Sequence, residues 1–150
     1  MVDELLDNLP VKDLLRLSTM SLATADAAGR PYAAPVYFVV GEGLRFYFFS
    51  EASSRHSQDV YRSSLAAAAI YPETSGWQDI RGLQMTGIIE EVIIGEEWER
   101  AWELYQAKFP FVAELRALVT RNSLYVFKPN WIRLLDNSLG FGQKQEWSLG

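Results

Sequence analysis

The spacing of hydrophobic and polar positions changes several times along the chain, and each change predicts a new element. Apolar side chains at helical intervals predict a short amphipathic helix over residues 12–18. Runs rich in aromatic and β-branched residues then predict strands at 21–26, 31–40 and 44–49. Turns at Gly29 and at residues 41–43 separate these strands, so we expect the three to form a meander.

Helical and strand patterns alternate in the rest of the chain. The expected elements are a helix from Ser54 to Ser63, strands at 65–71 and 80–94, helices at 96–109 and 111–119, and strands at 123–129 and 131–136. Residues 65–71 are small and apolar, so a helical continuation is the alternative there. Gly87, inside the long strand, is typical of a bulge or a close approach. The aromatic face of Trp98, Trp102 and Tyr105 predicts a core or dimer-packing surface.

This order of elements is mainly β with inserted helices, which favours an antiparallel β-barrel over a doubly wound sheet. The 150 residues fit one domain, 1–150, without a linker, an internal repeat or a low-complexity tract. No uncharged apolar stretch approaches the roughly 18 residues of a membrane helix, and the acidic start differs from a secretory signal. We therefore expect a cytoplasmic protein with no membrane partner.

Composition excludes several kinds of site. The chain has no cysteine and a single histidine, His56, which rules out disulfides, thiolate nucleophiles and metal sites built on two histidines. A Ser-His-acid triad would have to use His56. Motifs of dinucleotide, P-loop, zincin and serine-hydrolase sites are absent. Because the net charge is −5, we expect no nucleic-acid partner, and we expect no metal site.

The segment FFSEASSRHS, residues 48–57, carries a stronger chemical signal. Arg55 and His56 fall in the first turn of the expected helix, where the helix dipole disfavours each cation by roughly 0.3–1 kcal/mol. A bound phosphate would make both cations favourable, and nearby serine hydroxyls and free N–H groups would add donors. The alternative is that Ser54 is an ordinary N-cap and both cations are solvated. Spacing alone leaves both interpretations open.

This segment resembles the FMN-phosphate segment of the pyridoxamine 5′-phosphate oxidase-like split-barrel flavoproteins. Ser50, Ser54 and Arg55 match the family pattern directly, whereas His56 stands where the family usually has Lys. The stretch LATADAAGRPYAAPVYFVV resembles the opening hairpin of the family, including its Gly-x-Pro signature, and WQDIRGLQMTGIIEEV resembles a later strand. The resemblance covers roughly residues 12–95 and continues more loosely to about residue 135.

The resemblance implies an antiparallel split β-barrel of Greek-key type and a homodimer that binds FMN at the subunit interface. The loop and helix start would hold the phosphate, one strand would lie along the flavin ring, and a neighbouring strand would approach it. The residues implied for these three roles are Ser50, Ser54, Arg55 and His56 for the phosphate, Val36, Tyr37 and Phe38 for the ring, and Arg81 and Gln84 for the neighbouring strand.

Two departures from the family pattern argue against the named oxidase activity. Ala34 and Val39 stand near positions where true pyridoxamine phosphate oxidases have Arg and Lys, and the closing Arg-x-His substrate signature is missing. We therefore expect a flavin-dependent oxidoreductase that acts on an unidentified small molecule, with no catalytic side chain assigned. The alternatives are a non-enzymatic flavin or haem binder, in which His56 would be the sole imidazole ligand, and a cofactor-free interaction module.

The C-terminal segment DNSLGFGQ, residues 136–143, adds one candidate. A Gly-Phe-Gly stretch can bring an aromatic ring close to a ligand, so Phe141 is expected to cover or border the flavin site. The alternative is a C-terminal loop with two turn glycines.

Overall fold

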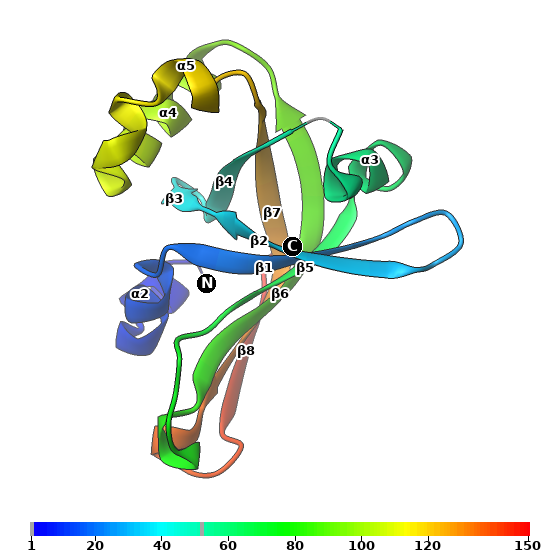
Figure 1. Cartoon of the computed structure of the whole chain (residues 1–150). Coiled ribbons are helices and arrows are strands. Elements are labelled where there is room, and N and C mark those ends of the chain that lie inside the picture. Colours follow the sequence, from blue (N-terminus) through cyan, green and yellow to red (C-terminus); the bar gives the residue numbers. More distant parts are fainter. Residues whose placement is uncertain (1, 52) are drawn as a thin grey trace.

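One antiparallel sheet curls into a half-barrel, and short helices surround it (Figure 1). The computed structural model describes residues 2–51 and 53–150. The strands are β1 Thr19–Ala25, β2 Pro31–Tyr37, β3 Val39–Gly41, β4 Arg45–Ser50, β5 Leu65–Ile70, β6 Arg81–Val92, β7 Ser123–Asp136 and β8 Lys144–Ser148. The helices are α1 Val2–Asp7, α2 Leu9–Leu15, α3 Arg55–Arg62, α4 Glu96–Lys108 and α5 Arg116–Val119, with 3₁₀ turns η1 Trp77–Asp79, η2 Pro110–Ala113 and η3 Asn137–Leu139.

The strand order explains how the sheet closes. It runs β2-β1-β5-β6-β7-β4-β3, with β8 also paired to β7. β2 and β3 lie at opposite ends of this order, yet only Phe38 separates them in the chain. Phe38 is fully buried, and its amide donates to the carbonyl of Ser18 at 3.1 Å. The chain therefore bends at Phe38 and bridges the two edges of the sheet.

The expected meander over residues 21–49 is wrong for this reason. The predicted strand 31–40 is two strands, of which β2 pairs with β1 and β3 pairs with β4. β4 finds its second neighbour in β7, far along the chain. Closure of the half-barrel thus overrides the local preference for pairing between consecutive strands.

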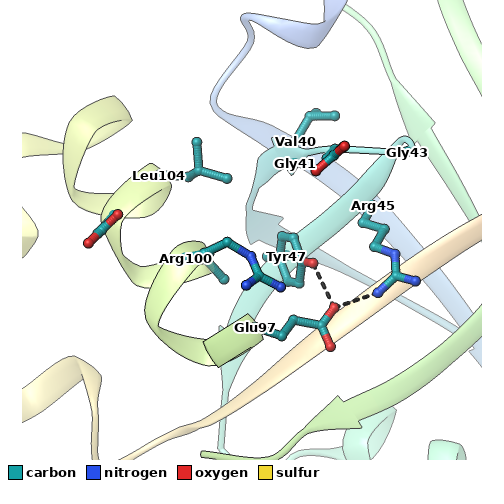
Figure 2. Close-up of a pocket in the computed structure, with 11 residues that line it drawn as sticks. Val40, Gly41, Gly43, Arg45, Tyr47, Glu97, Arg100 and Leu104 are labelled. Atoms are coloured by element: carbon teal, nitrogen blue, oxygen red, sulfur yellow. Dashed lines mark hydrogen bonds and ion pairs between the residues drawn. The ribbon is translucent and has the colours of Figure 1, made fainter. Parts of the chain in front are cut away.

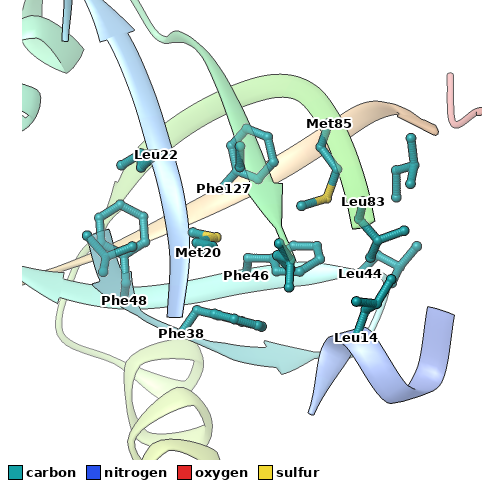
Figure 3. Close-up of a cluster of buried hydrophobic side chains, with 14 of the residues drawn as sticks. Leu14, Met20, Leu22, Phe38, Leu44, Phe46, Phe48, Leu83, Met85 and Phe127 are labelled. Atoms are coloured by element: carbon teal, nitrogen blue, oxygen red, sulfur yellow. The ribbon is translucent and has the colours of Figure 1, made fainter. Parts of the chain in front are cut away.

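Alternate side chains of the strands fill the inside of the half-barrel (Figure 3). The buried members of this core include Met20, Leu22, Phe46, Phe48 and Phe127. Each such side chain stabilises the fold by roughly 1.5–3 kcal/mol on burial. A second buried cluster lies under α4, where Trp102 and Tyr105 pack with Val39 and Tyr47. The packing role predicted for the aromatic face of this helix is therefore confirmed.

The ladder between the two longest strands, β6 and β7, contains a bulge. Their register shifts between Thr86 and Gly87, so that Gly87 lies opposite Pro129 and the ladder skips Asn130. β7 therefore runs through Pro129 as one strand, whereas the sequence predicts two strands. The bulge accommodates the proline, which has no N–H group to give to the ladder.

Most of the other expected elements are confirmed close to their predicted limits. Residues 65–71 hold a strand rather than a helical continuation. The N-terminal helix expected over 12–18 is instead α2, which ends at Leu15, and the helix expected over 111–119 is broken into η2 and α5. The expected C-terminal loop continues into β8, which pairs with β7 and buries Trp147. None of the helices that the structure describes has the length and apolar character needed to cross a membrane.

The bulge makes Gly87 difficult to replace. In Gly87→Ala the new β-carbon would lie 2.8 Å from Cα of Pro129 and closer still to the carbonyl oxygen of Lys128. Because these are backbone atoms, we expect the free energy of unfolding to drop by roughly 1–3 kcal/mol in chemical denaturation. Gly76→Ala is the matched control, since the nearest atom to its β-carbon is 4.0 Å away. Equal losses in both variants would contradict this role of Gly87.

Candidate functional site

The start of α3 brings the predicted phosphate residues together. β4 ends at Ser50, and α3 begins at Arg55 after a short connection. Ser54 is the N-cap, because its backbone is extended and its hydroxyl accepts a hydrogen bond from the amide of Ser57 at 3.4 Å. Ser54 thus has the N-cap role that the alternative interpretation gives it. The first N–H groups of α3 have no partner within the helix, as at any helix start.

Three of the predicted residues form a hydrogen-bonded cluster at this helix start. The Nε2 atom of His56 lies 2.5 Å from the hydroxyl of Ser50 and 3.3 Å from that of Ser54. The two hydroxyl oxygens are 3.2 Å apart, and Ser54 donates to the hydroxyl of Ser57 at 2.8 Å. The short sequence spacing of Ser50, Ser54 and His56 thus becomes direct contact.

His56 is a buried imidazole rather than a solvated cation. It is 7% exposed, and the rings of Tyr32 and Phe48 each have their centres 6.4 Å from its own. Burial lowers the pKa of His56, and the nearby Asp59 carboxylate opposes this only in part, so the ring is neutral at pH 7. The interpretation of His56 as a solvated side chain is wrong, and its contact with a phosphate stays a prediction.

Arg55 is the exposed cation of this site. Its guanidinium lies 4.9 Å from the centre of the Tyr32 ring, and its Nη2 atom lies 3.8 Å from the carboxylate of Asp26. Asp26 also binds Arg30, whose backbone amide and side chain hold the pKa of Asp26 below its usual value despite desolvation. Asp26 thus partly compensates Arg55 within the chain. One contact at 3.8 Å occupies few of the five guanidinium donors.

The predicted flavin wall consists of the end of β2, the strand that also carries Tyr32, and of Phe38 directly after it. Val36 and Phe38 are buried, whereas Tyr37 is 51% exposed and meets the ring of Phe109 edge-on at 5.3 Å. The carbonyl oxygens of Tyr37 and Phe38 accept hydrogen bonds from side chains of α4 at 3.2 and 2.9 Å. The Tyr37 ring is therefore the exposed part of this wall.

Arg81 and Gln84 lie apart from the start of α3 in a single chain. Gln84 stands three strands away from β2, in the row Pro35, Ser21, Ala69 and Gln84 across the sheet. Both residues line a half-open hollow of about 340 Å³. Arg81 lies 4.0 Å from the carboxylate of Asp13, and the side chain of Gln84 accepts a hydrogen bond from Arg133 at 2.8 Å.

Phe141 is also distant from α3 in the same chain. It is 80% exposed, in the turn between η3 and β8 at the far end of the arm formed by β6, β7 and β8 (Figure 1). Its ring meets Trp77 edge-on at 5.8 Å. The Asn137 side chain donates to the carbonyl of Trp77 at 2.8 Å and accepts from the amide of Gly142 at 3.0 Å. These bonds hold the aromatic pair in an ordered turn.

A larger hollow, which the sequence does not reveal, lies between α4 and the hairpin of β3 and β4 (Figure 2). Its volume is about 760 Å³, within the usual size range of ligand pockets. One carboxylate oxygen of Glu97 accepts hydrogen bonds from Tyr47 and Arg45, both at 2.7 Å. These bonds lower the pKa of Glu97 despite its partial burial. Arg45 and Glu97 are 52 residues apart, so no local pattern signals this wall.

Comparison with known proteins assigns the chain to a family. The sequence model of the pyridoxamine 5′-phosphate oxidase family matches residues 11–136. The UPF0306 protein YhbP of Escherichia coli is 32% identical over 111 residues, which cover 74% of this chain and 71% of that protein. The chain belongs to the pyridoxamine 5′-phosphate oxidase-like family.

Solved structures confirm the antiparallel split barrel expected for a pyridoxamine 5′-phosphate oxidase-like chain. HutZ, the haem storage protein of Vibrio cholerae, has a TM-score of 0.71 at 15% identity, covering 92% of this chain and 91% of HutZ. A FAD-binding protein of Mesorhizobium loti has a TM-score of 0.67 at 14% identity, covering 82% and 87%. By their names, proteins with this fold bind more than one kind of cofactor.

The burial of His56 predicts a pH-dependent stability for this family member. Its pKa is lowered in the folded state, so the unfolded chain binds more protons just below pH 6.5 and the free energy of unfolding should fall as the pH falls through 6.5. One such group contributes a slope of up to about 1.4 kcal/mol per pH unit. Denaturation of His56→Gln between about pH 7.5 and 5.5 should give a shallower decline. Equal slopes in variant and wild type would mean that His56 is not buried as a neutral ring.

Proposed function

We propose that this protein is an FMN-binding flavoprotein that acts as a flavin-dependent oxidoreductase on a small molecule in the cytoplasm. The start of α3 supports the proposal, since Arg55 opens the helix with a half-exposed guanidinium and the Ser50 hydroxyl lies 3.2 Å from that of the N-cap Ser54. A phosphate monoester suits all of these groups, because it carries roughly 1.5 to 2 negative charges and three acceptor oxygens. FMN has such a group at the end of its ribityl chain.

The side chains of the site have separable roles in this proposal. Arg55 supplies a permanent positive charge and a planar fork that matches a phosphate. Tyr32 and Asp26 hold that guanidinium in place. The apolar segment 36–38 would support the flat flavin ring along β2. Bound FMN would supply the hydride or electron transfer, so the chain has to supply position and electrostatics.

We also propose a homodimer that uses the outer face of the sheet. Across β2, β1 and β5 this face carries two rows of small uncharged side chains, Ala33, Ala23 and Ala67 in one and Pro35, Ser21 and Ala69 in the other. These side chains are exposed or partly exposed in the single chain. A face of small uncharged side chains favours contact with a second copy of itself around a two-fold axis.

A second copy would also give a role to the predicted site residues that lie far from the start of α3 within one chain. Gln84 follows Ala69 along the same outer face, and Arg81 lines the same hollow. Phe141 stands at the end of the arm, exposed and ordered by Trp77. We propose that these three residues approach the flavin held by the partner subunit.

Haem binding is the alternative, because solved structures of this fold include a haem storage protein. His56 is the only histidine; its Nε2 atom is bound to Ser50 and its ring is buried. Coordination of iron by His56 would require breaking this bond and exposing the ring, so the geometry favours FMN. Reconstitution with each cofactor, followed by absorbance, separates the candidates. Flavin bands support the proposal, a Soret band alone supports haem, and no chromophore supports an interaction module.

Arg55→Ala should weaken FMN binding by about 1.5–3 kcal/mol, the range for hydrogen bonds to charged groups. Riboflavin lacks the phosphate and should lose much less affinity. Fluorescence titration with both flavins measures the two losses. Arg62→Ala, in the last turn of α3, is the matched control and should bind FMN like the wild type. Equal losses for FMN and riboflavin would refute the phosphate role of Arg55.

The dimer can be tested by sedimentation at low micromolar concentration, where the wild type should have twice the chain mass. Ala67→Arg places a charge on the outer face, so it should shift the protein toward monomer and weaken FMN binding, because a ligand across an interface stabilises the assembled form. Ala107→Arg, on the exposed side of α4, is the control. A monomeric wild type that binds FMN with full affinity would refute the shared site.

A further inference from the structure

Hydrogen bonds inside the cluster limit which hydroxyl can donate to an anion at the start of α3. Ser54 gives its hydroxyl hydrogen to Ser57 at 2.8 Å, and as the N-cap it accepts from the Ser57 amide. Three contacts have no fixed direction: Ser50 to Ser54 at 3.2 Å, and Nε2 of His56 to Ser50 at 2.5 Å and to Ser54 at 3.3 Å. Because Ser54 has given its hydrogen to Ser57, only Ser50 can donate in the contact between Ser50 and Ser54. If Ser50 donates to His56, it has no hydrogen left for a ligand.

The surroundings of the imidazole favour one of its two neutral tautomers. Nδ1 of His56 is buried and, within the described part of the chain, has no hydrogen-bond partner. A hydrogen on Nδ1 would therefore be a buried donor without an acceptor, which is costly. A hydrogen on Nε2 points instead to the oxygen of Ser50, with Ser54 at 3.3 Å as a second acceptor. The Nε2–H tautomer leaves no donor unsatisfied, and the ring atom that then lacks a partner is the Nδ1 acceptor.

Charges around the ring do not overcome its burial. Asp59, on the same helix, favours a protonated ring, but its carboxylate also accepts a hydrogen bond from Thr24 of β1 at 2.8 Å. Arg55 precedes His56 in the chain, but its guanidinium lies against Tyr32 and Asp26. Tyr32 from β2 and Phe48 from β4 cover the ring with aromatic surface. We therefore expect the imidazole to act in its neutral form.

We propose that His56 is a positioning residue: as the neutral Nε2–H tautomer it donates to the oxygen of Ser50, so Ser50 keeps its hydroxyl hydrogen, which turns from Ser54 to the phosphate when the phosphate binds. This inference rests on the proposed FMN function. It replaces the second cation that the family resemblance implies at His56 with a neutral group that acts through Ser50. Arg55 is then the permanent cation of the site.

Nitrogen-15 NMR of histidine-labelled protein tests the tautomer directly, because the single histidine gives one pair of ring signals. At pH 7 we expect a pyrrole-like shift for Nε2 and a pyridine-like shift for Nδ1, both without ligand and with FMN. The opposite tautomer would overturn the proposal. Two pyrrole-like shifts in the FMN complex would also overturn it, because they identify an imidazolium.

FMN affinity tests the link between His56 and Ser50. Ser50→Ala and His56→Leu should each weaken FMN binding about tenfold, and the double variant no further, because Ser50→Ala removes the donor and His56→Leu removes the hydrogen bond that orients it. His56→Gln, whose amide can donate to Ser50, should recover most of the affinity, and riboflavin binding should not change in any variant. Additive losses, or full FMN affinity in Ser50→Ala, would overturn the proposal. A wild type that does not bind FMN would refute the proposed function itself.

Discussion

The side chain of Lys108 links the end of α4 to the segment between α2 and β1 and to the bend at Phe38, and the half-barrel depends on these contacts. Its ammonium donates to the carbonyls of Leu15, Leu17 and Phe38 at 3.3, 2.7 and 2.9 Å, and it lies 3.9 Å from the centre of the Phe38 ring. Burial lowers the pKa of Lys108 to about 8, while the three acceptors favour its charged form. The end of α4 thereby holds the bend at Phe38, from which β2 leads to Tyr32 beside α3.

Local sequence patterns predict most elements of this fold but not how the strands pair. The limits of α3 follow from Ser54, whose side chain is a good N-cap. The bend at Phe38 has no such signal, because the residues around it are all strand formers and predict one continuous strand. Pro129 predicts a break in β7, yet Gly87 on the opposite strand leaves room for it. Pairing depends on contacts that are distant in sequence.

Some features of the candidate site can likewise be predicted from the sequence, and others cannot. Ser50, Ser54 and Arg55 are predictable because one short segment carries them and a helix start gathers them. The burial of His56 is not, since it depends on Tyr32 of β2, outside that segment, as well as on Phe48 of β4. The hollow beside Glu97 cannot be predicted from the sequence either, because the residues of its wall are distant in the chain. Residues that act through a partner subunit would be further still from any local pattern.

The start of α3 is the proposed binding site for the phosphate of a flavin. Amide NMR shifts during a titration with FMN, compared with a titration with riboflavin, test this claim most directly. FMN should shift the backbone amides of Arg55, His56 and Ser57 strongly, whereas riboflavin should leave them nearly unchanged, because only the phosphate reaches the helix start. Shifts confined to the hollow between α4 and the hairpin of β3 and β4, or the same shifts with both flavins, would contradict the claim.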